Sequence, residues 1–383
     1  MIETDRTVSH LFAGGGGDVA GFQAAGFRPL IAVNHDGPAV ETLRTNFPGC
    51  RTRQADINNL DMRSLPSTRY LVGSPICTEA APASGLATPT AAQPSLLDGD
   101  QDQVPAAQWN RTRATAYDLL RAAEVHRYEA VTFENVPRFA SWILFDAWLR
   151  SWQALGYGVQ LVSVDAAHLG APQHRHRLLG VFTRRGVRVD LRVRPTSTCA
   201  TCGTVRGVQK WNTGRRTGTY GQQYRYVCPN RRCGHAEVTP VLVPFRDAVE
   251  WAVPGRPIAA GRARRREHTP YEAATLARIE TGLRRFGGEP FLAVLRRNCT
   301  VQALVEPVGT ITAAGNHHML VVPGADLAST RVRMLTPREK ARAQTFPDAH
   351  RFAGSDTAQG RQIGNAVAVV AAHWLAERLA AAA

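Results

Sequence analysis

Cys77 has the surroundings of a nucleophile. It follows a short apolar run, Arg69 to Val72, that predicts a buried strand, and Pro75 stands just before it. Residues 86–108 are rich in Ala, Pro, Gln and Asp and predict a long loop after it. A thiolate at a strand end beside such a loop suits covalent catalysis. An ordinary buried thiol is the alternative, and it is the more common fate of a lone cysteine.

Polar residues that could do chemistry also lie in or directly after two other predicted strands. Glu134 follows the run Ala130–Phe133, where a carboxylate either does chemistry, is solvated or caps a helix. Residues 173–177 read Gln-His-Arg-His-Arg, so Arg175 and Arg177 would share one face of an extended strand. A salt-bridged edge strand would have the same pattern.

A glycine cluster, Gly14 to Gly17, separates the apolar run Val8–Phe12 from a helical stretch that ends near Gly26. The order strand, glycines, helix lets backbone N–H groups approach a ligand closely at a helix N-terminus. A flexible turn is the alternative. Asp36 and Asp56 each come near a predicted strand end, where ligand contacts gather in sheets of this kind.

Four of the seven cysteines form two close pairs. Two residues separate the first pair, 25 residues lie between the pairs, and four residues separate the second: Cys199, Cys202, Cys228 and Cys233. In a reducing compartment such pairs are more often metal ligands than disulfides. The spacing resembles a zinc ribbon, and Gly203 and Gly234 suit tight metal-binding turns, so we expect a structural Zn²⁺. Reduced thiols in a core are the alternative, and His235 is an alternative ligand.

These groups need a scaffold, and the first 183 residues alternate strands with helices. The alternation predicts an α/β, doubly wound sheet of Rossmann type. Beyond the strands above, further ones are expected at Leu30–Val33 and Leu178–Phe182, with helices around 114–126 and 142–155. From about Arg331 the pattern becomes helical again.

The net charge of +15 is confined to one segment. Residues 184–300 contain 23 Lys and Arg against 8 Asp and Glu, while the rest of the chain is neutral. Such an excess suits a polyanion, with nucleic acid ahead of an acidic membrane surface. Between the cysteine pairs, basic and aromatic residues that could meet phosphates or bases alternate: Arg215, Arg216, Tyr220, Tyr224 and Arg225. A solvated face is the alternative for about half of them, because most DNA contacts are to phosphate.

Six motifs along the whole chain, in order, resemble those of the DNA (cytosine-5) methyltransferases. Each is weak alone, but their order makes a chance match very improbable. They are Phe12-Ala-Gly-x-Gly-Gly17, Pro75-x-Cys77, Glu134-Asn-Val136, Gln173-x-Arg-x-Arg177, Arg333-x-Leu-Thr-x-Arg-Glu339 with Gln344-x-Phe-Pro-Asp348, and Gln362-Ile-Gly-Asn-Ala-Val367.

The resemblance implies a mechanism and catalytic residues. The Cys77 thiolate would add to C6 of cytosine, and Glu134 would hydrogen-bond the N3/N4 edge, so that C5 takes a methyl group from S-adenosylmethionine. Arg175 and Arg177 would hold the base carbonyl and position the nucleophile loop. In a duplex the base must first be flipped out of the stack.

The resemblance also implies the cofactor contacts. Phe12 would stack on the adenine, with Ala13, Gly14 and Gly16 in the glycine turn and Pro75 beside the ring. Asp56 would read the adenine amino group next to Ile57, and Asn365 would lie near the methionine end. Asn34 stands where the family has the acid that holds the ribose hydroxyls, and His35 where it has an aromatic residue.

The chain departs from the family pattern in other places. His10 stands where an acid is common, and Thr78-Glu-Ala-Ala81 follows the cysteine in place of Gln-x-Phe-Ser. The second change puts the contacts of the loop in doubt, but not the nucleophile.

Three domains are therefore expected: residues 1–183 as the catalytic domain that binds S-adenosylmethionine, 184–330 as a target recognition domain with the ribbon at about 195–240, and 331–383 packing back on the first. The expected partner is double-stranded DNA, bound by a monomer, with a cognate restriction endonuclease acting separately or the enzyme an orphan. No apolar run approaches the roughly 18 residues that span a bilayer, so we expect a cytoplasmic, nucleoid-associated protein without membrane contact. The same chemistry on tRNA, transfer of a group other than methyl, and an inactive DNA-binding homologue remain alternatives.

Overall fold

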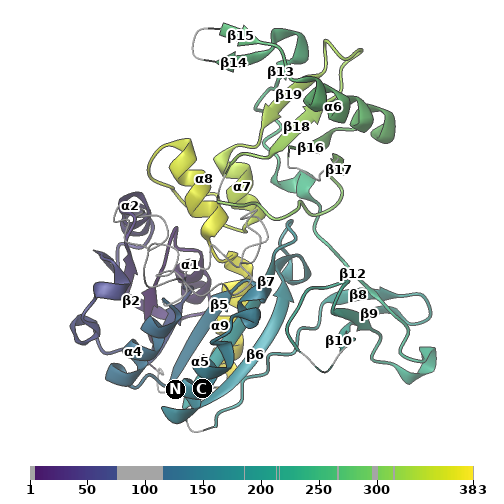
Figure 1. Cartoon of the computed structure of the whole chain (residues 1–383). Coiled ribbons are helices and arrows are strands. Elements are labelled where there is room, and N and C mark those ends of the chain that lie inside the picture. The colour runs from purple at the N-terminus through teal and green to yellow at the C-terminus, as the bar shows by residue number, and fades with distance from the viewer. Residues whose placement is uncertain are drawn as a thin grey trace, which may run out of the picture.

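The computed structural model describes residues 5–75, 115–184, 186–212, 214, 216–264, 267–295, 301–313 and 315–382 (Figure 1). Three groups of elements are visible in it. A large sheet with helices on its faces holds the first part of the chain, and two smaller β-rich parts lie to one side of it.

A seven-stranded sheet forms the first part, which confirms the α/β fold class. Its strands follow the order β3-β2-β1-β4-β5-β7-β6, and all run parallel except β7, which is antiparallel to both neighbours. The bounds are β1 (Thr7–Leu11), β2 (Arg28–Asn34), β3 (Arg51–Gln54), β4 (Tyr70–Gly73), β5 (Ala130–Asn135), β6 (Tyr157–Asp165) and β7 (His176–Arg184). The carboxyl ends of β1, β2, β3, β4 and β5 therefore meet at one edge, where ligands bind in open sheets of this class.

Helices cover both faces of this sheet. On one face, Trp148 and Trp152 of α5 pack against Phe133 and Phe182, and the rings of Trp152 and Phe182 stack at 4.2 Å. On the other face, α1 and α9 pack together with β1 and β4. The helices are α1 (Gly17–Ala24), α2 (Gly37–Asn46), α4 (Ala116–His126), α5 (Phe145–Ala154) and α9 (Val369–Ala382). Within the described ranges, no helix is long and apolar enough to cross a membrane.

Residues 196–240 form a small β module that we call the ribbon. Two sheets build it, one with the order β12-β8-β9 and one that pairs β10 with β11. The strands are β8 (Thr196–Cys199), β9 (Gly203–Arg206), β10 (Val208–Trp211), β11 (Tyr224–Val227) and β12 (Thr239–Pro240). In Figure 1 the ribbon lies beside β6, the edge strand of the large sheet.

The other β-rich part contains a five-stranded antiparallel sheet of order β13-β19-β18-β16-β17 and the hairpin β14–β15. Its elements are β13 (Arg256–Pro257), β14 (Arg262–Arg264), β15 (Glu267–Thr269), α6 (Ala273–Phe286), β16 (Phe291–Val294), β17 (Val301–Ala303), β18 (His318–Val322) and β19 (Arg331–Met334). The expected boundary at residue 330 falls between β18 and β19, and these two strands pair. Residues 331–334 therefore form a strand of this sheet, where a helical pattern was expected to begin.

Two helices, α7 (Pro337–Ala343) and α8 (Asp356–Asn365), then lead back to α9. A capping box starts α7, because the side chain of Thr336 accepts from the backbone of Glu339 and Glu339 reaches back. Short 3₁₀ turns also occur in the described residues: Ile57–Asn59, Met62–Ser64, Pro137–Ser141, Ala166–Leu169, Arg231–Cys233, Phe245–Ala248 and Ile258–Ala260.

Candidate functional site

Glu134 and Arg177 form an ion pair at the carboxyl edge of the sheet. Nε of Arg177 lies 2.6 Å from Oε1 of Glu134, and their side chains are 12% and 13% exposed. The pair arises because β5 and β7 are neighbours, with Glu134 opposite Leu179 in the ladder. The carboxylate and the guanidinium are thus held together, partly shielded from water, where they can act on one ligand group.

Arg175 has different hydrogen-bond partners from Arg177, although the sequence groups the two together. Its side chain is only 2% exposed. The guanidinium donates to the carbonyl oxygens of Ile311 at 3.1 Å, Gly364 at 2.8 Å and Ala366 at 2.9 Å. Two of these carbonyls lie at the C-terminal end of α8, whose dipole favours a cation. Arg175 therefore holds the C-terminal helices to the catalytic strand through both terminal nitrogens of its guanidinium.

Asn135 contributes a contact that the sequence analysis missed. Its buried Nδ2 donates to the carbonyl oxygen of Pro75 at 2.9 Å, and its Oδ1 accepts from the backbone of Val136. The residue after Glu134 thus fixes the end of the segment that leads into the proposed nucleophile. Cys77 itself lies outside the described residues. The amide in the Glu-Asn-Val motif was the signal in the sequence.

The glycine turn follows β1 and begins α1. Phe12, Gly14 and Gly16 all have positive φ, of 60°, 50° and 83°, and Gly16 caps the helix. The turn is tied to the end of β2, because the N–H of Ala13 donates to Val33 at 3.1 Å. Gly16 has no room for a side chain, since an added Cβ would lie 2.6 Å from the Phe47 ring. This backbone leaves N–H groups at a helix N-terminus free for a ligand that approaches closely.

The departure at position 10 has a structural partner. Nδ1 of His10 lies 2.9 Å from Oδ2 of Asp18, and both side chains are almost fully buried. An acidic side chain is therefore present in the first turn of α1, next to the position where the resemblance led us to expect one.

The remaining predicted cofactor residues lie along the same edge of the sheet. Asn34 ends β2 and is 7% exposed, and its Oδ1 accepts from the N–H of Asp36 at 2.9 Å. One oxygen of Asn34 is thus committed to the turn, which leaves its NH₂ group for a ligand. His35 and Asp56 are exposed, and the carboxylate of Asp56 caps the turn that begins at the buried Ile57.

C-terminal residues complete the glycine turn. Nε2 of His350 lies 3.0 Å from the carbonyl oxygen of Gly15, and burial lowers the pKa of His350 to about 4, so it is neutral at neutral pH. An added Cβ on Gly17 would lie 2.1 Å from the carbonyl oxygen of Val367, so this segment touches the first turn of α1. Asn365, between these contacts, is exposed at the end of α8.

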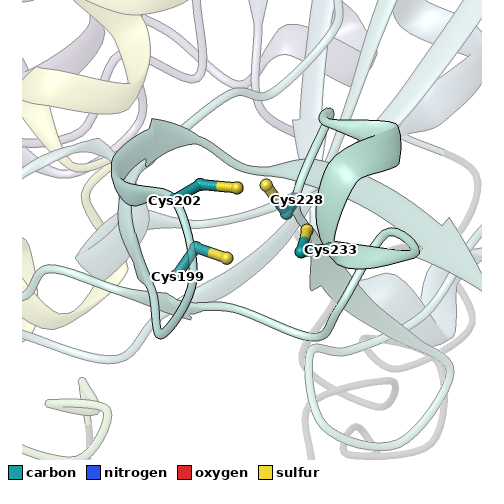
Figure 2. A group of neighbouring side chains, drawn as sticks. All are labelled: Cys199, Cys202, Cys228 and Cys233. Atoms are coloured by element: carbon teal, nitrogen blue, oxygen red, sulfur yellow. The ribbon is translucent and has the colours of Figure 1, made fainter.

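The two cysteine pairs converge in the ribbon. The Sγ atoms of Cys199, Cys202, Cys228 and Cys233 lie within 4.8 Å of one another. Figure 2 shows the sulfur atoms pointing into a common space from two facing loops. Tetrahedral zinc with Zn–S bonds of about 2.3 Å requires sulfur atoms about 3.8 Å apart, so the donor set fits this ion. Backbone N–H groups of Cys202 and Thr201 lower the pKa of Cys199 to about 7.

The glycines after each pair adopt the expected turns, with φ of 71° at Gly203 and 63° at Gly234. The ring of His235 instead lies 3.0 Å from the carbonyl oxygen of Cys228. The expectation that Tyr224 could meet DNA is wrong, because it is 1% exposed in the core of the ribbon. Arg216 and Arg225 are exposed, and Arg215 lies outside the described residues.

Comparisons with known proteins give a matching family model, related sequences and a similar solved structure. The family model for C-5 cytosine-specific DNA methylases matches residues 7–87 and 106–381. The type II methyltransferase M.AgeI of Thalassovita gelatinovora is 28% identical over 192 residues, which is 47% of this chain and 40% of that protein. M1.HphI of Haemophilus parahaemolyticus is 23% identical over 97% of this chain and 86% of its own length. The fold is similar to that of a Spodoptera frugiperda DNMT2 variant, with a TM-score of 0.58 over 98% of this chain and 99% of that one at 14% identity.

Proposed function

Because the chain belongs to the C-5 cytosine-specific DNA methylase family, we propose that it transfers a methyl group from S-adenosylmethionine to C5 of cytosine in double-stranded DNA. The observation that carries the proposal is the Glu134–Arg177 ion pair beside the segment that leads to Cys77. A thiol nucleophile, a carboxylate and a guanidinium are the groups that this chemistry needs.

The residues divide the reaction as follows. The Cys77 thiolate forms a bond to C6 with its own electron pair. Glu134 hydrogen-bonds the N3/N4 edge and favours protonation at N3, while Arg177 holds the carboxylate and reaches the O2 side of the base. The ring electrons displaced by the thiolate make C5 nucleophilic. Bound S-adenosylmethionine supplies an electrophilic methyl group. Water then takes the proton from C5, the C–H electron pair forms the C5–C6 double bond, and the C6–S bond breaks to release the Cys77 thiolate.

The cofactor edge supports the same proposal. The glycine turn after β1 offers backbone N–H groups, Asn34 ends β2, and Asp56 and Pro75 follow the ends of β3 and β4 in the same parallel part of the sheet. In such sheets a ligand lies across the strand ends. Asn34 can still hydrogen-bond a ribose through its NH₂ group.

Duplex DNA is the substrate that the charge favours. The ribbon carries seven basic residues and one acidic residue. Six of the basic ones are exposed: Arg206, Lys210, Arg216, Arg225, Arg231 and Arg232. Such a surface suits phosphates, which supply most of the affinity for DNA. Because the target atom is stacked inside the duplex, the base must be flipped into the site. We propose that the protein acts as a monomer on nucleoid DNA, either as an orphan methyltransferase or with a cognate restriction endonuclease that acts separately.

We also propose that the four ribbon thiolates hold one structural Zn²⁺. The ribbon spans few residues, and two short turns alone bring its cysteine pairs together, so the metal would stabilise its fold. Metal analysis of the purified protein should give one equivalent, and Cys228→Ser should lose it. Well below one equivalent in the unaltered protein would reject the zinc site.

The activity test uses tritiated S-adenosylmethionine with unmethylated duplex DNA or with tRNA, followed by identification of the labelled base. Label in 5-methylcytosine of DNA is expected, and it should disappear in Cys77→Ser and in Glu134→Gln. Cys50→Ser is the control for the loss of a buried thiol, because Cys50 packs in a hydrophobic cluster with Leu43 and Phe47. Three other results would reject the proposal. Label in tRNA alone would favour the tRNA alternative, a different modified base would favour transfer of another group, and no label would favour an inactive DNA-binding homologue.

A further inference from the structure

The ribbon is attached to the outer edge of the catalytic sheet at a defined point. Nε2 of Gln209 donates to the carbonyl oxygen of Ser163 at 2.9 Å. The N–H of Gly218 donates to Oγ of the same serine at 3.0 Å. Ser163 lies in the edge strand β6 and is fully buried. Edge strands present unpaired backbone groups, and the ribbon satisfies one of them here.

The ribbon and the sheet also share one hydrophobic core. Side chains of β6 and β7 belong to the same buried cluster as the ribbon residues, namely Val162, Val164, Leu179, Val205, Tyr224, Tyr226 and Cys228. His168, in the turn after β6, packs against the rings of Tyr220 at 4.6 Å and Tyr226 at 5.1 Å. A module that only held DNA would not need to share a core with the catalytic sheet.

Asp165 links the strand that contacts the ribbon to the segment that leads into the site. It lies two residues after Ser163, at the end of β6, and is fully buried. Its Oδ1 accepts from the backbone N–H of Arg175 at 2.7 Å, and its Oδ2 lies 2.7 Å from Nδ1 of His174. Burial would raise the pKa of Asp165, but the bond with His174 and the nearby histidines lower it to about 2. The carboxylate is thus charged at neutral pH and holds the segment that continues into Arg177.

We propose that the ribbon is a positioning element for catalysis, because through Ser163 and Asp165 it fixes the strand that carries Arg177 against Glu134. The inference rests on the methyl-transfer function proposed above. Its consequence is that weakening the attachment slows the chemical step with both substrates bound. A displacement of about 1 Å of a catalytic group can cost about a hundredfold in rate.

The test compares Gln209→Ala with Gln222→Ala in the full chain. Gln222 is the matched control, because it lies in the same ribbon, is exposed, and its side chain meets Thr219 rather than β6. Three quantities are measured for each: the single-turnover rate at saturating DNA and S-adenosylmethionine, the Kd of each substrate, and the zinc content. We expect Gln209→Ala to lose about tenfold or more in rate with both Kd values within about twofold, and the control to match the parent.

A second pair of variants provides a graded readout at Asp165. Asp165→Asn keeps an acceptor for the N–H of Arg175 but loses the charge that holds His174, whereas Asp165→Ala loses both. The single-turnover rate should therefore fall in the order parent, Asp165→Asn, Asp165→Ala. The inference is overturned if the rate at saturation stays at the parent value in Gln209→Ala, whatever the Asp165 variants do, or if only the Kd for DNA changes. Absence of labelled cytosine with the parent protein would instead reject the methyl-transfer function, and the inference with it.

Discussion

Exchanging each of the two arginines for lysine should separate stability from catalysis. Arg175 donates to three carbonyl oxygens, at 3.1, 2.8 and 2.9 Å, from two different segments. A lysine ammonium is a single point on a flexible stem and can reach one or two of them. A buried acceptor left without a donor costs about 1–3 kcal/mol, so Arg175→Lys should lose about 2–4 kcal/mol of unfolding free energy.

Arg177→Lys should have the opposite profile. The Arg177 side chain is partly exposed and its main partner is Glu134, so the free energy of unfolding should change by only about 1 kcal/mol. Its single-turnover rate should fall about a hundredfold, because the guanidinium geometry against Glu134 is lost. Urea unfolding followed by circular dichroism measures the first quantity, and rapid-quench methyl transfer with saturating substrates measures the second.

The reasoning fails if Arg175→Lys unfolds at the same urea concentration as the parent and loses single-turnover rate with normal cofactor binding. That result would mean that Arg175 acts on the base, as the family pattern suggested. Equal loss of stability in both variants would also contradict the division of roles.

Three further perturbations test other parts of the site. Gly17→Ala should destabilise the fold and weaken cofactor binding, because its Cβ would lie 2.1 Å from the carbonyl oxygen of Val367. Gly49→Ala is the control, because Gly49 has open space around it and the change should affect neither quantity. Thermal melts measure stability and cofactor titrations measure binding. The pKa of His350 is lowered to about 4, so its contribution to the free energy of unfolding is present above pH 6.5 and is lost as the pH falls toward 4. In His350→Phe, the decrease in the free energy of unfolding between pH 6.5 and pH 4 should be smaller by about 2–3 kcal/mol, as measured by urea titrations at several pH values. Asn34→Asp should tighten S-adenosylmethionine binding several-fold in calorimetry, because a carboxylate keeps the bond to the turn and adds an acceptor for the ribose; unchanged or weaker affinity would argue against a ribose contact at this position.

Local patterns in the sequence were enough to predict the sheet, the glycine turn and the convergence of the cysteines. Apolar runs that end in polar residues located most of the strands, and the spacing of the two pairs predicted that the four thiols would meet. Each of these features is visible in residue types and spacings within short stretches of the chain, although the strands themselves pair over longer separations.

Features that depend on distant residues were missed. Arg175 and Arg177 have the same place in the alternating pattern, but one faces carbonyls more than 130 residues away and the other faces Glu134. Likewise, Tyr224 reads as an exposed aromatic among arginines, yet the ribbon needs it for a core. The strand at 331–334 was also missed, because it is short and alternates arginine with apolar residues, and pairing with β13 and β18 completes it.

The contact of Gly15 and Gly17 with His350 and Val367 has a consequence for biosynthesis. The ribosome makes the glycine turn first, and the residues that close it emerge roughly 350 positions later. At about 5–20 residues per second this interval lasts about 20–70 s. During that time the growing chain has strands and a glycine turn but lacks the backing that shapes the turn. The ability to bind the cofactor is therefore expected to arise late in translation, and chains whose synthesis stops early would not transfer methyl groups.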